Sequence, residues 1–112
     1  MTPLKIIETE PGKFSLLLDA GYTKVDDLIE KLGHAPNGYF WEGIAQLLVT
    51  TGAPEIDGRF EYDPEAGMFC AFGGDRAALE KLGMLMAAVA NDGEQLRKLV
   101  ADAKASGFEF DD

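Results

Sequence analysis

Two short apolar segments near the amino terminus predict a β-hairpin. They cover residues 4–8 and 13–19 and are joined through Pro11 and Gly12. Proline presets the negative φ and glycine supplies the positive φ of a type II turn, which fits this junction. In the second segment apolar side chains recur at every second position from Phe14, so one face of that strand is expected in the core.

The next part of the chain changes to the period of a helix. Apolar residues at i, i+3, i+4 and i+7 across residues 25–32 gather on one helical stripe. Thr23 with Asp26 suits the start of this helix and Gly33 suits its end. A second helix is expected over residues 37–52, just ahead of a proline.

A second hairpin and a second pair of helices follow. The hairpin strands are expected at residues 59–63 and 67–73, around a turn that contains Pro64. The second of these strands is apolar on both faces, which predicts a central position in the sheet. Asp75 is expected to cap a third helix and Asp92 to open a fourth.

The predicted elements follow the order ββααββαα and define an α+β fold. We expect a small antiparallel sheet built from two hairpins, with helices packed on it. A chain of 112 residues suffices for one such core and is too short for two, so residues 1–112 are expected to form a single domain. The closing segment, residues 108–112, is expected to be either a short edge strand or a frayed tail.

The charge balance argues against several classes of partner. Twenty Asp and Glu against ten Lys and Arg give a formal net charge of −10. Such an excess disfavours binding to nucleic-acid phosphates and lacks the basic patch that recognises anionic membranes. The sequence shows neither a signal-peptide pattern nor an apolar run of about 20 residues. We therefore expect a cytoplasmic protein with no nucleic-acid and no membrane partner.

Residues that commonly carry catalysis or bind metals are scarce. The only histidine, His34, falls in an expected surface loop, and the only cysteine, Cys70, falls in the most apolar strand, where a thiol is usually inert. The sequence leaves a Cys70–His34 pair open but contains nothing that favours it. One cysteine and one histidine cannot form a zinc or iron–sulfur cluster, and the acidic residues lack the spacing of a calcium loop. We expect no cofactor and no bound metal.

Acidic residues occupy alternate positions around the third predicted strand. Glu61 and Asp63 would project from one face of that strand while Phe60 and Tyr62 point to the core, and Glu65 continues the alternation. Three interpretations remain open. They are a solvated face that discourages edge-to-edge aggregation, a surface for a basic partner, and a metal or acid–base site.

Three consecutive aromatic residues begin the second predicted helix. Successive helical residues lie about 100° apart, so three rings span about 200°, which is wider than one buried stripe. Tyr39, which shares its side with Glu42, is the ring expected at the surface. A role in the core or in fixing the start of the helix is the alternative for this cluster. Tyrosine and tryptophan frequently anchor protein interfaces.

Two segments resemble the immunity protein 51 family of bacterial polymorphic toxin systems. They are residues 37–42 (NGYFWE) and residues 60–72 (FEYDPEAGMFCAF), and the resemblance extends over about residues 19–82. It implies a non-catalytic inhibitor that binds a cognate toxin domain and blocks it. The resemblance brings no established contact residues with it.

The leading hypothesis is therefore an immunity protein that neutralises a basic toxin domain stoichiometrically. Exposure and charge nominate the partner-binding residues, which are Tyr39, Trp41, Glu42, Glu61, Asp63 and Glu65. One alternative is a protein-interaction or regulatory domain outside toxin systems. Another is a small enzyme that uses Glu61 and Asp63 as paired carboxylates. The sequence predicts nothing about self-association.

Overall fold

A four-stranded antiparallel sheet forms one layer of the computed structural model, which describes residues 1–112. Its strands lie in the spatial order β1-β2-β4-β3. They are β1 (Lys5–Glu10), β2 (Lys13–Asp19), β3 (Glu61–Tyr62) and β4 (Met68–Gly73). The two predicted hairpins are thus joined through β2 and β4, and β4 lies inside the sheet as predicted.

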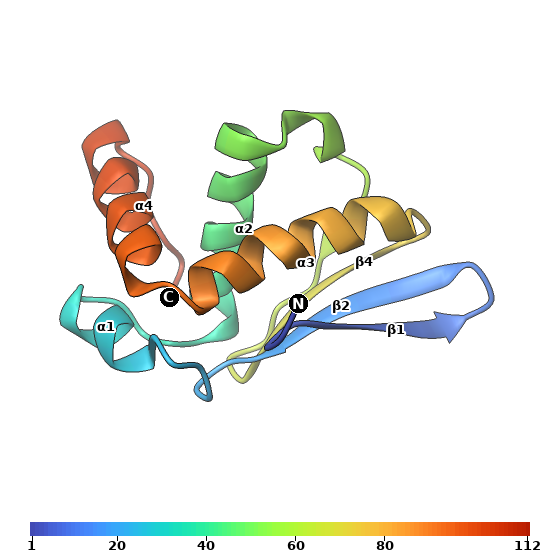
Figure 1. Cartoon of the computed structure of the whole chain (residues 1–112), viewed down its shortest axis with the longest axis horizontal. Helices are drawn as coiled ribbons and strands as arrows, with labels where there is room; N and C mark the ends of the chain where they lie inside the picture. The colour runs from blue at the N-terminus through green and yellow to red at the C-terminus, as the bar shows by residue number, and fades with distance from the viewer.

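Helices form the second layer (Figure 1). They are α1 (Asp26–Lys31), α2 (Gly38–Gly52), α3 (Arg76–Ala90) and α4 (Gly93–Ser106). Helices α2 and α3 contact β4 and β2 on one side of the sheet, and α4 packs against α3 and α2. The observed order ββααββαα confirms the predicted α+β fold. A short 3₁₀ helix, η1 (Pro54–Ile56), follows α2 and was not predicted.

The helices begin where polar side chains cap them. The side chain of Asn37 accepts a hydrogen bond from the Phe40 N–H at 2.9 Å, and Asp75 accepts one from the Ala78 N–H at 3.0 Å. Asp92 caps α4 in the same way. Each cap satisfies a backbone donor that the first helical turn leaves unpaired. The predicted starts of α2, α3 and α4 are therefore confirmed by the interactions that set them.

The core lies between the sheet and the helices. The strand residues Leu16, Leu18, Phe69 and Ala71 and most of the apolar stripes of α2 and α3 are fully buried, and Ile6, Phe14 and Tyr62 pack against them partly buried. Its largest side chains are Leu16, Leu18, Ile29, Phe40, Trp41, Ile44, Phe69, Leu79, Leu82, Met86 and Leu96. The start of α2 is pressed against the β3–β4 turn, because a Cβ atom at Gly38 would collide with the carbonyl oxygens of Glu65 and Met68. This contact holds the start of α2 against the β3–β4 turn.

The C-terminal segment, residues 108–112, is neither an edge strand nor a frayed tail, so both predictions for it were wrong. It runs back between α4 and α2 (Figure 1). The Phe110 ring stacks on Phe40 with 4.9 Å between ring centroids. The Asp112 carboxylate accepts a hydrogen bond from the Ala35 N–H at 2.7 Å and lies 3.1 Å from Nδ1 of His34. These contacts bind the tail to the helical layer.

Candidate functional site

One face of the sheet is left without a helical cover. Since α2 and α3 pack on the side of Leu16 and Phe69, the alternate residues of β2 and β4 point the opposite way. We refer to this side as the open face and define it by the strand register. Its members are Lys5, Ile7, Lys13, Ser15, Leu17, Asp19, Glu61, Asp63, Glu65, Met68, Cys70 and Phe72.

The centre of the open face is apolar. Leu17 and Cys70 are cross-strand neighbours in the middle of the sheet, and both are half-buried. Phe72 is 37% exposed and Ile7 is 42% exposed, whereas Leu16 on the helix-covered face is 0% exposed. The open face thus keeps several large apolar side chains in contact with water.

Carboxylates line the β3 side of this apolar centre. Glu61 pairs with Phe72 across the sheet, and the Asp63 N–H donates to the Cys70 carbonyl at 2.9 Å. Glu65 forms a bridge with Met68. All three acidic residues are exposed and none forms an ion pair. The predicted common face of Glu61 and Asp63 is confirmed.

The carboxylates of the β3 edge affect the pKa of the only thiol, Cys70. Burial raises the pKa of Cys70, and the charges of Asp63 and Glu65 raise it further, although a hydrogen bond with Ser15 acts in the opposite direction. A raised pKa keeps the thiol protonated, which makes it a weak nucleophile and a weak metal ligand.

Tyr39 and Glu42 lie in the first turns of α2, and Glu42 is near Tyr62 of β3 on the helical side of the sheet. Tyr39 is 39% exposed, which confirms the predicted orientation of its ring. Burial raises the pKa of Glu42, and the charge of Asp111 adds to the effect. Burial also raises the pKa of Tyr62 to about 12, with smaller contributions from Glu42 and Asp57. A second group of negative charges therefore stands beside β3, on the helical side of the sheet.

Trp41 does not reach the surface. It is 0% exposed, and its ring meets that of Phe40 edge to face with 5.8 Å between centroids. Its indole Nε1 has no hydrogen-bond partner within the protein. The nomination of Trp41 as a contact residue therefore does not fit the structure. Helix α2 is covered by the sheet, by α3 and by the C-terminal tail, so its buried arc is wide enough for both Phe40 and Trp41.

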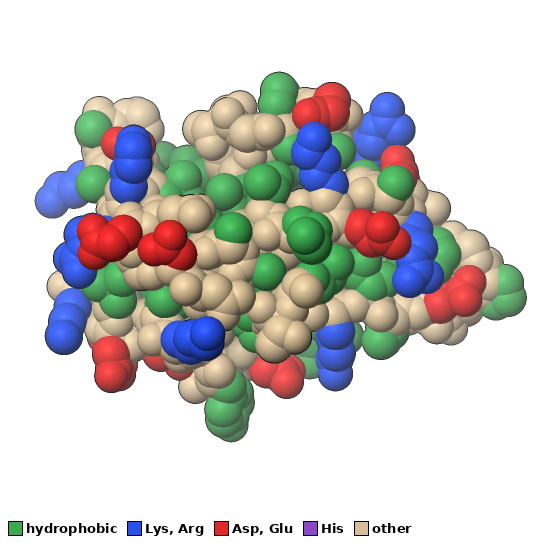
Figure 2. Space-filling view, in the orientation of Figure 1, with side chains coloured by type: hydrophobic (Ala, Val, Ile, Leu, Met, Phe, Trp, Pro, Cys, Tyr) green, Lys and Arg blue, Asp and Glu red, His purple; other side chains and the backbone are tan.

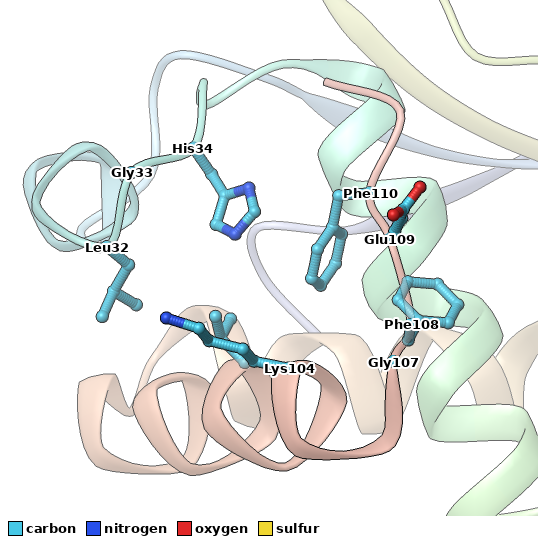
Figure 3. A pocket seen from close by; sticks show the side chains of 9 residues that line it. Leu32, Gly33, His34, Lys104, Gly107, Phe108, Glu109 and Phe110 are labelled. Carbon is cyan, nitrogen blue, oxygen red and sulfur yellow. The ribbon is translucent and has the colours of Figure 1, made fainter.

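The largest cavity, about 580 Å³, lies between the α1–α2 loop, α4 and the C-terminal tail (Figure 3). The rings of His34 and Phe110 line it and meet edge to face, with 4.7 Å between centroids. His34 pairs with Asp112, a contact that sequence reasoning missed. The residues that line this cavity are Leu32, Gly33, His34, Val100, Lys104, Gly107, Phe108, Glu109 and Phe110. A histidine–carboxylate pair activates a hydroxyl or thiol only within hydrogen-bond reach, and none lines this cavity.

His34 and Cys70 are not brought together. Cys70 lies on the open face and lines a separate hollow with Ser15, Asp63 and Phe72. No group of three or more His, Cys, Asp and Glu side chains is arranged to hold a metal ion. None of the helices has the length and apolar character required to cross a membrane.

The chain belongs to the Immunity protein 51 family, whose family model matches residues 4–105. This match covers the whole sheet and nearly all of the helical layer, and it ends before the C-terminal tail. Membership gives the protein an immunity role against a toxin, and it makes a toxin the expected partner. Nothing among curated proteins and nothing among solved structures matches the chain.

Proposed function

We propose that this protein binds one cognate bacterial toxin domain in a one-to-one complex and neutralises it by binding alone. The observation that carries the proposal is the family match over residues 4–105. The proposal concerns a stoichiometric inhibitor, so the relevant features of the chain are surfaces that can contact another protein.

The distribution of charge supports a basic toxin. Helices α3 and α4 carry internal ion pairs, such as Arg76–Glu80 and Lys98–Asp102, each at 2.9 Å. On the side of the molecule that Figure 2 shows, acidic and basic side chains are intermixed. In contrast, the carboxylates that flank β3 have no cationic partners. They are Glu42, Glu61, Asp63 and Glu65. Unpaired charge of one sign accelerates encounter with a partner of opposite sign.

The contact residues that we retain surround β3. Glu42 lies near Tyr62 on the helical side, Tyr39 follows the contact of Gly38 with the β3–β4 turn, and Glu61, Asp63 and Glu65 lie on the open face. The alternative of an enzyme that uses Glu61 and Asp63 gains no support. Both side chains are exposed, and neither has a hydrogen-bonded group that would tune it for acid–base chemistry.

The test is co-expression with the C-terminal domain of the neighbouring gene product, followed by titration of the purified proteins. We expect rescue of growth and loss of toxin activity that is linear in added protein and complete at one equivalent. Light scattering on the isolated complex checks the one-to-one ratio. Complete inactivation by a small fraction of an equivalent would indicate an enzyme and contradict the proposal. A demonstrably toxic domain that is neither bound nor neutralised would also contradict it for that pairing.

A further inference from the structure

We propose that the toxin docks on the open face of the sheet, with a basic part of its surface over β3 and apolar contacts over β4. The occupant we infer is a positively charged surface of the cognate toxin domain. This inference rests on the proposed function and adds to it the face that does the binding.

The first argument is the composition of β4. A sheet with one solvated face normally alternates apolar residues, which point inward, with polar residues, which point outward. β4 departs from this rule, because its outward residues are Met68, Cys70 and Phe72. No helix of the chain covers them. An apolar set that continues across neighbouring strands to Leu17 and Ile7 is typical of a surface that another protein covers.

The second argument is the placement of charge at the two edges of this face. The β3 edge presents Glu61, Asp63 and Glu65, all without ion pairs. The β1 edge presents Lys5, which pairs across the sheet with Leu17. The carboxylates of the face are thus concentrated at β3, with Asp19 at the end of β2, whereas Lys5 and Lys13 lie on β1 and β2. A partner therefore gains most when its cationic groups lie over β3. Such an asymmetry sets the orientation of the complex as well as its rate of formation.

The third argument is a hollow at the junction of the apolar and acidic parts. A depression of about 420 Å³ is lined by Thr9, Lys13, Ser15, Asp63, Cys70 and Phe72, among others. A lysine or arginine side chain from the partner fits the chemistry of this hollow. Its methylene stem would lie against the Phe72 ring, and its charged end would meet Asp63. Lys13 of the same chain also lines the hollow, but its ammonium group pairs with Glu10 at 3.4 Å and forms no ion pair with Asp63.

A second copy of this chain is a poorer occupant. Each copy carries a formal net charge of −10, so two copies repel each other as they approach. A basic toxin surface removes that repulsion and supplies the cations that the β3 edge lacks. We therefore choose the toxin, and self-association becomes an outcome of the test.

The first experiment measures the affinity of the wild-type complex and of two double variants with the same change in net charge. Glu61→Lys/Asp63→Lys alters the open face, and Asp27→Lys/Glu30→Lys alters exposed, unpaired carboxylates on α1. The loss of long-range electrostatic attraction to the toxin raises the Kd of both variants alike. Because only the first removes local charge contacts, we expect its Kd to exceed that of the second by at least about 30-fold.

A matched apolar pair tests the centre of the face. Phe72→Ala should weaken binding by at least about tenfold, because a buried aromatic contact is lost. Met84→Ala removes an isolated side chain on α3 that is 61% exposed, and its Kd should stay within about twofold of the wild-type value. Circular dichroism of each variant checks that the fold is retained.

A third measurement uses the unaltered protein. Cys70 is the only cysteine, so alkylation followed by mass spectrometry of its peptide reports on this face alone. We expect the complex to slow alkylation by at least about tenfold, because a docked protein excludes the reagent from the thiol.

The outcomes separate this inference from the proposed function. If the wild type does not bind, the proposed function fails for that toxin. If the wild type binds and neutralises, but the open-face variants bind like their controls and Cys70 stays equally reactive, docking on the open face is overturned and the proposed function stands. Concentration-dependent protection of Cys70 in the free protein would assign the face to a second copy and would also overturn the inference.

Discussion

β2 and β4 present two different surfaces with the same backbone. On the helical side Leu16, Leu18, Phe69 and Ala71 are removed from water, while on the open face Phe72 remains 37% exposed. The two sides share the same register and the same hydrogen bonds, so local backbone structure does not distinguish them. The difference comes from the covering layer, which the chain provides for one side only. A strand that is apolar on both faces is stable in water when another layer packs on each side. The helices provide one layer, and we expect another protein to provide the second.

The strongest test of this comparison uses two phenylalanines of β4. Phe69→Ala opens a cavity in the core and should lower the free energy of unfolding by about 3 to 5 kcal/mol. Phe72→Ala removes a partly exposed ring and should cost less than about 1.5 kcal/mol. Urea unfolding of the free protein measures both. Equal losses would mean that the open face contributes to the core as much as the helical side does.

The contact of α2 with the β3–β4 turn gives the next largest effect. A Cβ atom at Gly38 would collide with two backbone carbonyl oxygens, so Gly38→Ala should destabilise the protein by about 1 to 3 kcal/mol. Gly52, at the other end of α2, has open space around it, and Gly52→Ala should be neutral or stabilising by up to about 1 kcal/mol. Thermal unfolding of the two variants compares them. Similar melting temperatures would contradict the close contact.

The C-terminal tail, residues 108–112, packs on the helical layer, and its contribution to stability can be tested by substitution. Phe110→Ala loses the stacked contact with Phe40 and should cost about 1 kcal/mol. Glu109→Ala, at an exposed neighbouring position, serves as the control and should change stability by less than about 0.5 kcal/mol. Urea unfolding measures both variants. Equal free energies of unfolding for the two variants would show that the Phe110 contact does not stabilise the helical layer.

The smallest expected effect is electrostatic and depends on pH. The folded protein holds a proton on Glu42 more tightly than the unfolded chain does, because burial and Asp111 raise the pKa of Glu42 above 4.5. Its contribution to stability is therefore fully present below pH 4.5 and is lost as the pH rises through the raised folded pKa.

Glu42→Gln removes this dependence. The variant should melt slightly higher than the wild type at neutral pH, and the difference should shrink as the pH is lowered toward 4.5. Asp111→Asn should act in the same direction with a smaller amplitude, since the charge of Asp111 is the lesser cause. A Glu42→Gln variant that melts lower than the wild type at neutral pH would contradict the assigned sign.

Local signals predicted the parts of the fold that local interactions set. Asn37, Asp75 and Asp92 cap the helices that their positions predicted, and the two hairpins form at the expected turns. Hydrophobic periodicity also placed β4 in the middle of the sheet. These features depend on neighbours within a few residues, and the sequence displays those neighbours directly.

Features that depend on distant segments were not predictable in the same way. Trp41 is buried because α3, the sheet and the tail together enclose α2, and a helical wheel shows none of these. The contact between His34 and Asp112 joins residues far apart in the chain and leaves no mark in local periodicity. Likewise, the apolar residues on both faces of β4 predicted a central strand without indicating that Phe72 would remain 37% exposed. Of the nominated site, the orientation of Tyr39 and the common face of Glu61 and Asp63 could be predicted.

The pairing of β2 with β4 also bears on the order of events during synthesis. β2 ends at Asp19 and β4 begins at Met68, so the first hairpin leaves the ribosome well before its partner strand exists. Until that partner arrives, the hairpin can pair only with itself, and its apolar residues lack the helices that later cover them. Such non-local pairing is among the slower steps of folding. The four-stranded sheet is therefore completed only after β4 has been synthesised, so Leu17 of the first hairpin meets Cys70 only at that stage.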